Sequence, residues 1–232
     1  MKNFRKVVSK IKKIIINTAD KLLLGIEKKI HKKKWLAHHG IQRSGTNFLL
    51  ALLNKHNLRI INRHNTKRHK PGHKHFRWYE DKSLIPKEIF KQYCNDCYVF
   101  NIQQLNNACN FPSDTKHIVI YKKDSASLVS LLNWGLRVKW FSSKEEAVSS
   151  ADRFLKDIRE YHRFWISLSK IDPQNVQLVS YEHLVKDNML LKQKLIDLAF
   201  NAEHAELTID EVPQSPLNRR HVISFKDIEH LF

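Results

Sequence analysis

The sequence predicts an α/β protein in which a parallel β-sheet is flanked by helices. An apolar run at 35–39 leads through a glycine-containing turn into an apolar helix at 48–53. The run at 117–121 is continuous and β-branched, which is typical of a central strand buried on both faces of a parallel sheet. A third run, at 176–181, precedes a helical pattern at about 189–200. Repeated strand-to-helix order of this kind favours the α/β class.

The composition is that of one globular domain with an appendage. The chain has 232 residues, of which 42% are hydrophobic and 10% aromatic. This length is enough for a full hydrophobic core. We divide the chain into a basic N-terminal extension, 1–34, and an α/β domain, 35–232.

The net charge and the cysteine content limit the kinds of partner and the cellular compartment that we expect. The net charge is +18, with 14 His besides, which predicts anionic partners without choosing among nucleotides, nucleic acid, lipids and glycans. Cys94, Cys97 and Cys109 are too few for a disulfide framework, so we expect a reducing compartment. The lone Cys94-x-x-Cys97 pair is a weak signal, and we interpret both of its cysteines as ordinary residues. No run approaches the roughly 18 apolar residues of a membrane span. The apolar run at 14–16 is too short for a signal peptide, so the sequence predicts a cytoplasmic protein.

The N-terminal extension holds twelve Lys or Arg against Asp20 and Glu27. Its apolar residues recur every three to four positions: Val7, Val8, Ile11, Ile14, Ile15, Leu22, Leu23, Ile26 and Ile30. This pattern predicts a basic amphipathic helix or helix pair. Such a helix could lie on an anionic membrane as a peripheral anchor, or pack against the domain with its lysines in water. A nucleic-acid arm is disfavoured because aromatics are not interleaved with the basic residues.

The turn after the first predicted strand has the character of a phosphate-binding loop. Gly40 and Gly45 can adopt positive φ angles. Ser44, Thr46 and Asn47 would offer hydroxyls and backbone N–H groups at the start of a helix, where the dipole favours an anion. A tight turn that binds no ligand is the alternative.

The loop matches only the first half of a Walker A motif. Gly40 and Gly45 have the right spacing, but Thr46 and Asn47 stand where a nucleotide triphosphatase has Lys followed by Ser or Thr. The cation of the loop, Arg43, lies between the glycines. This arrangement suits a ligand with a single 5′-phosphate region, with the cation facing a leaving-group oxygen.

The next predicted elements are a short strand at 58–61 and a polar loop at 62–75. The loop contains four histidines: His64, His69, His73 and His75. Their spacing matches no zinc framework, and the neighbouring Lys and Arg would repel a cation, so no metal site is predicted. A solvated basic loop and a catalytic histidine remain as alternatives, because α/β proteins place chemistry in loops that follow strands.

Further strands are predicted at 98–102 and 117–121. After the second of these, Asp124 or Ser125 can cap a helix. Lys122 ends the strand and Ser130 follows eight residues later in the helix, so both could reach one phosphate. A surface lysine and an ordinary helix serine are the alternative.

The C-terminal half is predicted to contain a long helix at 145–170 that ends before Pro173. Aromatic and aliphatic residues form one face of it and are expected in the core: Phe154, Ile158, Tyr161, Trp165 and Leu168. After the strand at 176–181 and the helix at 189–200, the tail at 213–221 is loop-like, basic and able to fold over a site.

Three stretches resemble, in order, the motifs of the sulfotransferase family, whose donor is 3′-phosphoadenosine 5′-phosphosulfate (PAPS). Residues 40–47 resemble its 5′-phosphosulfate loop. Residues 118–130 are similar to its 3′-phosphate motif, in which a strand-end basic residue precedes a helix serine by eight positions. Residues 179–184 look like its strand followed by Tyr-Glu-Asp-Leu. The resemblance covers about 35–190.

The resemblance implies a three-layer P-loop-like fold and metal-independent transfer of a sulfuryl group from PAPS to a hydroxyl or amine. A saccharide or a lipid-linked sugar is the expected acceptor, by analogy. Arg43 would stabilise charge on the bridging oxygen as sulfate leaves. The implied donor-binding residues are Gln42, Arg43, Ser44, Gly45, Thr46 and Asn47 at the 5′ end, Phe48 against adenine, and Lys122, Ser130 and Arg219 or Arg220 at the 3′-phosphate.

The general base implied by the resemblance comes from the histidine-rich loop. His75 is the expected base, since bacterial members carry Lys-His after a glycine in a comparable place. Its competitors are His73, Glu80 and Asp81.

Two positions depart from the family pattern. Lys122 stands where Arg is usual, which keeps the charge but loses bidentate binding. His183 replaces Asp in the Tyr-Glu-Asp-Leu segment, which mainly supports the fold.

Two functions of other classes stay open. One is a Mg²⁺-dependent P-loop kinase or nucleotide triphosphatase. The other is a basic nucleic-acid-binding or membrane-binding protein with a vestigial P-loop.

Overall fold

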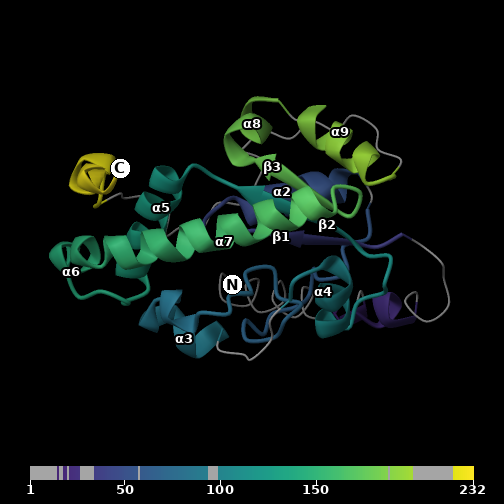
Figure 1. The fold of residues 1–232 in the computed structure, drawn as a ribbon, viewed down its shortest axis with the longest axis horizontal. Coiled ribbons are helices and arrows are strands. Elements are labelled where there is room, and N and C mark those ends of the chain that lie inside the picture. The colour runs from purple at the N-terminus through teal and green to yellow at the C-terminus, as the bar shows by residue number, and fades with distance from the viewer. Residues whose placement is uncertain are drawn as a thin grey trace, which may run out of the picture.

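The computed structural model describes residues 15, 18–19, 21–26, 34–56, 58–93, 99–187, 189–200 and 222–232. Its centre is a parallel sheet with strand order β1-β2-β3, formed by Leu36–His39, Lys116–Tyr121 and Val176–Ser180 (Figure 1). The predicted central strand is therefore confirmed. The register pairs His39 with Val119, and Tyr121 with Ser180, so the three strands point the same way. Their carboxyl ends meet at one edge of the sheet.

Helices follow each strand and fill the connections between them. Within the described residues these are α2 Thr46–Lys55, α3 Lys87–Tyr93, α4 Ile102–Cys109, α5 Asp124–Arg137, α6 Lys144–Ser149, α7 Ala151–Ile171, α8 Tyr181–Lys186 and α9 Met189–Asp197, with 3-10 turns η1 Lys82–Leu84, η4 Phe225–Asp227 and η5 Glu229–Leu231. Helices α2, α5 and α8 begin within a few residues of the ends of β1, β2 and β3.

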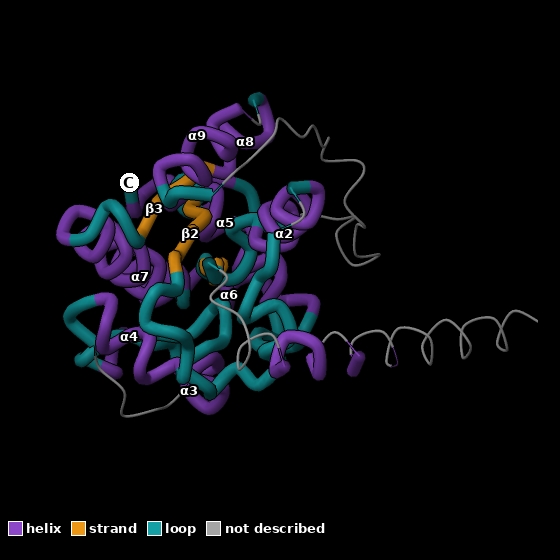
Figure 2. The backbone as a smooth tube through the Cα atoms, turned by 90° about the vertical axis from the view of Figure 1, so that its right-hand side faces the viewer, coloured by secondary structure: helices purple, strands orange, loops and turns teal. Residues whose placement is uncertain are grey.

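The sheet is buried on both faces by two separate hydrophobic clusters. Successive residues of a strand point to opposite faces, so Val119 joins one cluster while Ile118 and Ile120 join the other. The Val119 cluster contains residues of α5 and α7, and the other contains residues of α2 and α9. Figure 2 shows α7 and α2 on opposite sides of the strands. The predicted α/β arrangement, a parallel sheet flanked by helices, is confirmed.

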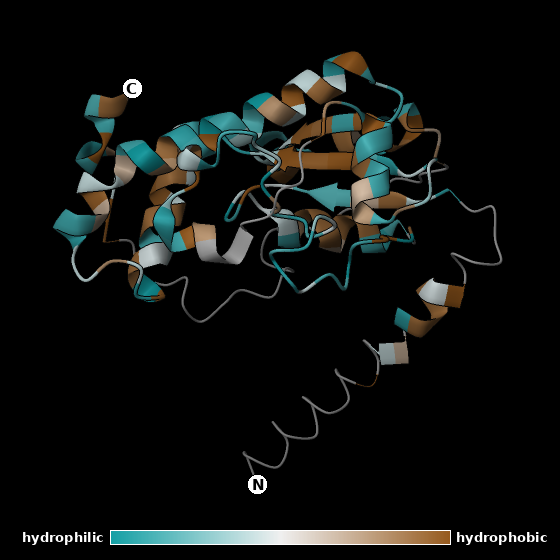
Figure 3. Cartoon of the chain, turned by 60° about the horizontal axis from the view of Figure 1, so that its bottom comes forward, coloured by the Kyte–Doolittle hydropathy of each residue, from teal (hydrophilic) through white to brown (hydrophobic). Residues whose placement is uncertain are grey.

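The long predicted helix at 145–170 is two helices, α6 and α7, separated at Ser150. All five residues of the predicted apolar face of α7, from Phe154 to Leu168, are buried. In Figure 3 brown and teal segments alternate along the helices, as expected for helices that cover a sheet.

Two predicted strands are wrong. The run at 58–61 contributes only one bridge, between Leu36 and Ile60, because turns begin at once after it. The predicted strand at 98–102 begins at Tyr98, which lies outside the described residues; in its described part, Asn101 accepts a hydrogen bond from the backbone of Gln104 and caps α4, which begins at Ile102. This side-chain cap overrides the β-branched pattern.

The predicted capping of α5 is also wrong. Lys123 is the cap residue and makes no side-chain hydrogen bond to the helix, and Asp124 is the first helical residue. The Asp124 carboxylate instead accepts a hydrogen bond of 2.9 Å from His162 of α7. The start of α5, like that of α2, is therefore without a side-chain cap.

Parts of the N-terminal extension are described, and they are helical as predicted: Ile15, Thr18, Ala19 and residues 21–26. The remainder of 1–33 lies outside the described residues. Among the residues that are described, no helix combines the length and the apolar character that crossing a bilayer requires.

Buried histidines connect β1 and β2 to their surroundings. Nε2 of His39 lies 3.0 Å from Nδ1 of His117, whose Nε2 lies 2.8 Å from Oδ1 of Asn106. Nδ1 of His38 lies 2.9 Å from Oδ1 of Asn62. Burial lowers the pKa of His38 and of His117 to about 3. Both rings are therefore neutral at pH 7.

These histidines predict that the fold loses stability in mild acid. In the unfolded chain they take up protons below about pH 6.5, whereas in the folded chain they stay neutral until about pH 3. The stabilisation is thus fully present above pH 6.5 and falls as pH drops. We expect each histidine to cost roughly 2 kcal/mol of the free energy of unfolding between pH 6.5 and 5.

Urea unfolding at a series of pH values measures this effect. Glutamine cannot be protonated, so His117→Gln should reduce the loss of unfolding free energy between pH 6.5 and 5 by the contribution of one histidine. An unfolding free energy that does not change between pH 7 and 5 would contradict the assignment of neutral buried rings.

Candidate functional site

The loop between β1 and α2 lies at the carboxyl edge of the sheet. Gly45 caps α2 with a φ of 96°, as predicted, but the second positive φ belongs to Arg43, at 71°, and not to Gly40. Gly40 is needed for space, since a Cβ there would meet Oγ of Ser44 at 2.6 Å. Non-glycine residues in this backbone region are uncommon and concentrate at functional sites. The positive φ angle of Arg43 accompanies the contact of its side chain with α5, which is described below.

The predicted donor-binding side chains of the loop divide into two groups. Gln42 and Ser44 are buried and serve the loop itself: Ser44 donates to the carbonyl of Ile41 at 2.8 Å, and Gln42 accepts from Arg77 at 2.6 Å. Asn47 is exposed. The backbone N–H groups at the start of α2, which no side chain caps, are the groups of the loop that suit an anion.

Phe48 was expected to stack on adenine. Its side chain is 3% exposed and packs into the core cluster that contains α2 and α9. The ring centroids of Phe48 and Tyr181 are 6.1 Å apart in an edge-on arrangement. The stacking role is therefore not retained, and Phe48 supports the loop from the core side.

Arg43 meets the predicted helix serine of α5. Its Nε donates to Oγ of Ser130 at 3.4 Å, and its guanidinium carbon lies 5.3 Å from the ring centroid of Trp134, one turn further along α5. Burial lowers the pKa of Arg43, and the positive charge of Arg137 adds to this. Two residues predicted on separate motifs, 87 positions apart, are thus in contact.

Lys122 brings the second predicted motif to the same edge. Its Nζ lies 5.1 Å from the ring centroid of Tyr181, the first residue of α8. A Cβ on Gly45 would meet that same ring. Burial lowers the pKa of Lys122, Glu182 opposes this, and Arg43 adds to the lowering. The loops after β1, β2 and β3 therefore converge, with cations from two of them close enough to repel each other.

The histidine-rich loop packs against the same site. Nδ1 of His75 lies 2.5 Å from the carbonyl oxygen of Gly40. Because a carbonyl only accepts, Nδ1 carries the proton and Nε2 keeps its lone pair. Burial and the neighbouring charge of Lys74 hold the pKa of His75 well below 6.5. The predicted base is therefore neutral at pH 7, which is the form that accepts a proton.

The other candidates for the general base have different roles or lie elsewhere in the structure. The ring nitrogen of His73 accepts from the backbone N–H of His75 at 3.1 Å, so His73 positions the residue next to it. Asp81 caps η1 and binds the hydroxyl of Ser83. Glu80 is exposed. The ring of His75 contacts the loop after β1 through the carbonyl of Gly40.

Lys74 is a site residue for which the sequence predicted no role of its own. Its Nζ donates to Oδ1 of Asn47 at 2.9 Å, and its carbonyl accepts from the backbone of Gly40 and from the hydroxyl of Tyr161. Burial lowers its pKa to about 8, with a contribution from Arg68. Its position between two histidines was the only available signal. It adds a third cation to the site.

A buried ion pair fixes the geometry of both loops. The Arg77 guanidinium binds both carboxylate oxygens of Asp157 on α7, at 2.6 and 3.0 Å, and both side chains are fully buried. The same guanidinium donates to Gln42 and to the carbonyl of His75. Tyr79 donates to Asp157 as well. Neither Arg77 nor Asp157 stood out in the sequence, because each belongs to a pattern typical of surface charges.

Two sets of predicted residues are not part of this description. Arg219 and Arg220 lie outside the described residues, as do Cys94 and Cys97. Within the described ranges, no group of three or more His, Cys, Asp and Glu side chains could hold a metal ion.

Comparison of the chain with protein-family models, with curated proteins and with solved structures gave no match.

The buried ion pair makes a prediction about stability. Arg77→Met should lower the free energy of unfolding by about 3–5 kcal/mol, because it leaves the Asp157 carboxylate buried without its cation. Arg77→Met combined with Asp157→Leu should recover most of that loss. Urea unfolding of the two variants measures the difference.

Lys156→Met is the control, since it removes an exposed ion pair with Asp152 and should change stability by less than about 1 kcal/mol. An Arg77→Met variant as stable as this control would show that the pair does not hold the two loops.

Proposed function

We propose that the chain is a PAPS-dependent sulfotransferase. The observation that carries the proposal is the contact between Arg43 and Ser130, with Lys122 beside them, at the carboxyl edge of a parallel sheet. Residues that the family resemblance assigns to opposite ends of one nucleotide come together in space. The N-terminus of α2, which has no side-chain cap and no acidic residue in its first turn, begins at the same edge and favours a bound anion.

The 5′-phosphosulfate would bind across the loop after β1. Backbone N–H groups at the start of α2 would hold the 5′-phosphate. Arg43 would face the bridging oxygen from the α5 side, and the Lys74 ammonium, held by Asn47, would face the sulfuryl group from the side of the histidine-rich loop. Fixed cations of this kind stabilise charge that develops on the leaving group.

The 3′-phosphate would bind to Lys122 and Ser130. The hydroxyl oxygen of Ser130 accepts from Arg43, which leaves its own O–H to donate to a phosphate oxygen. Burial lowers the pKa of Arg43 and of Lys122, and a neighbouring cation adds to the lowering in each case, Arg137 at Arg43 and Arg43 at Lys122. A bound phosphate would oppose these effects. The positive charge of these partly buried side chains therefore suits a nucleotide with two phosphate groups.

His75 would take the proton of the acceptor. Its Nε2 lone pair would remove the hydroxyl proton as the acceptor oxygen bonds to sulfur, and the bond from sulfur to the bridging oxygen would break. The electron pair of that bond would leave on adenosine 3′,5′-bisphosphate beside Arg43. The sulfuryl group next to His75 is negatively charged, so its presence raises the pKa of the ring at the moment of reaction.

The proposal also includes a class of acceptor and a cellular compartment. A saccharide or lipid-linked sugar hydroxyl suits a site flanked by Lys74 and a polar, histidine-rich loop. The reaction would take place in the cytoplasm, as the sparse cysteines predict, and requires no metal ion in this scheme.

Loss of the loop cation is the direct test of the mechanism. Arg43→Ala should lower kcat by about 10²–10³-fold, because it removes stabilisation of the leaving oxygen while the fold is kept. The assay measures release of adenosine 3′,5′-bisphosphate from PAPS in the presence of a chelator. Arg163→Ala, at an exposed position of α7, is the matched control and should retain normal turnover.

Normal turnover in Arg43→Ala would remove Arg43 from the mechanism. Hydrolysis of nucleoside triphosphates that requires Mg²⁺, without PAPS turnover, would replace the proposal by the kinase or triphosphatase alternative.

The pKa of Lys74 predicts a limit at high pH. If its ammonium binds the sulfuryl group, kcat/KM falls as pH rises through about 8, where Lys74 loses its proton. Lys74→Arg, which stays protonated, should move that fall to higher pH. Lys123→Arg, at an exposed neighbouring cation of the sheet edge, should leave the profile unchanged.

A pH profile that is identical in wild type and Lys74→Arg would contradict this role for Lys74.

A further inference from the structure

The guanidinium of Arg43 rests on an aromatic ring of α5. Its carbon atom lies 5.3 Å from the ring centroid of Trp134, and the Nε of Arg43 donates to Oγ of Ser130 at 3.4 Å. Ser130 and Trp134 are four positions apart, so their side chains lie on the same face of the helix. The face of an aromatic ring carries partial negative charge and attracts a cation above it. A long hydrogen bond and a ring contact therefore hold Arg43 against α5.

The helix is anchored on both sides of Trp134. The side-chain oxygen of Asn133 accepts from the backbone N–H of Ile223 at 3.1 Å, and its Nδ2 donates to the carbonyl of the same residue at 2.8 Å. Ile223 is itself fully buried. On the other side, a Cβ on Gly135 would collide with the ring of Phe141, so the helix packs closely there. The backbone that carries the Trp134 ring is therefore fixed by its neighbours.

Two opposing forces act on the Arg43 guanidinium. Arg137 follows Trp134 by three positions, and its positive charge adds to the effect of burial in lowering the pKa of Arg43. This repulsion pushes the guanidinium away from the later part of α5, whereas the Trp134 ring attracts it. The ring contacts the face of the guanidinium and so uses none of its N–H groups. Trp134 can thus hold the cation without competing for the donors that an oxygen anion would need.

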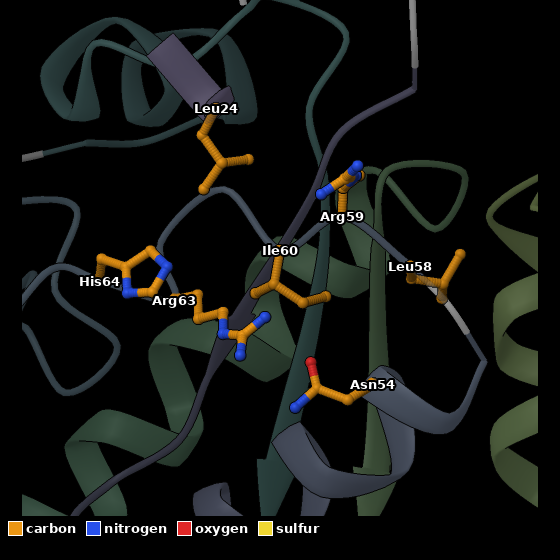
Figure 4. Close-up of a pocket in the computed structure, with 7 residues that line it drawn as sticks. All are labelled: Leu24, Asn54, Leu58, Arg59, Ile60, Arg63 and His64. Atoms are coloured by element: carbon orange, nitrogen blue, oxygen red, sulfur yellow. The ribbon is translucent and has the colours of Figure 1, made fainter. Parts of the chain in front are cut away.

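A cavity in the described part of the chain lies elsewhere, beside the last turns of α2 (Figure 4). Leu24, Asn54 and residues of 58–64 line it. None of these residues belongs to α5 or to the loop after β1, so this cavity does not hold Arg43 in place.

We propose that Trp134 is a positioning residue, whose ring holds the Arg43 guanidinium beside the bridging oxygen of the donor. The inference rests on the proposed function, because it takes the role of Arg43 from there. A long arginine side chain loses much rotamer freedom when it is fixed. A ring that fixes the cation before the donor binds keeps this cost out of the chemical step, and the cation then faces the charge that develops on the leaving oxygen.

The kinetics of variants at position 134 test this role. Trp134→Leu should lower kcat about tenfold and change KM for PAPS by less than about twofold, because the contact acts on the orientation of Arg43 in the transition state. Trp134→Phe keeps an aromatic face and should retain kcat within about threefold of wild type. In an Arg43→Ala background, Trp134→Leu should change kcat by less than about twofold, since the cation that it positions is gone.

The control is Phe100→Leu, which removes a ring that is 68% exposed and should leave kcat unchanged. A second measurement reports the contact without turnover. Urea unfolding of Arg43→Ala and Trp134→Leu, singly and combined, should show effects on the unfolding equilibrium constant that depart from additivity by about threefold.

The outcomes separate this inference from the function on which it rests. A wild-type chain that does not turn over PAPS would reject the proposed function and, with it, the role of Trp134, even if the unfolding data showed the contact. If the wild type is active, three results would overturn the positioning role alone. These are a kcat of Trp134→Leu equal to that of the control, an equal loss of kcat with and without Arg43, and a Trp134→Phe variant no more active than Trp134→Leu.

Discussion

The buried ion pair between Arg77 and Asp157 is the constraint on which the candidate site depends. It is costly to bury two charges, and the geometry offsets that cost because the guanidinium bonds satisfy both carboxylate oxygens. The remaining donors of Arg77 reach Gln42 in the loop after β1 and the carbonyl of His75. One side chain therefore fixes the loop after β1 and the proposed base against α7.

The electrostatics of the site follow from this rigid scaffold. Arg43, Lys74 and Lys122 come from three different segments, and burial lowers the pKa of each. Such an arrangement destabilises the protein by itself, because like charges repel in a partly dehydrated setting. A bound polyanion removes that penalty. In the proposed function, the cost in stability and the affinity for a doubly phosphorylated ligand would have the same physical origin.

The sequence predicted the parts of the fold whose signal is local. Continuous β-branched runs gave β2 and β3, and the glycine loop gave the junction of β1 with α2. Predictions of secondary structure failed where a single side-chain hydrogen bond determined the backbone conformation, as at Asn101, which caps α4. Arg77 and Lys74 were missed because their importance lies in long-range contacts, and one sequence does not reveal which charged residues become buried. Phe48 was expected from the resemblance to stack on adenine, but its side chain is buried in the core.

The central claim is that the loops after three parallel strands form one site for a 3′,5′-bisphosphorylated nucleotide without a metal ion. Calorimetric titration of the full chain with adenosine 3′,5′-bisphosphate, in the presence of a chelator, tests it most directly. We expect one molecule to bind per chain, and adenosine 5′-monophosphate to bind at least about tenfold more weakly because it lacks the phosphate for Lys122 and Ser130. Equal affinity for the two nucleotides, or binding only of ATP with Mg²⁺, would contradict the account.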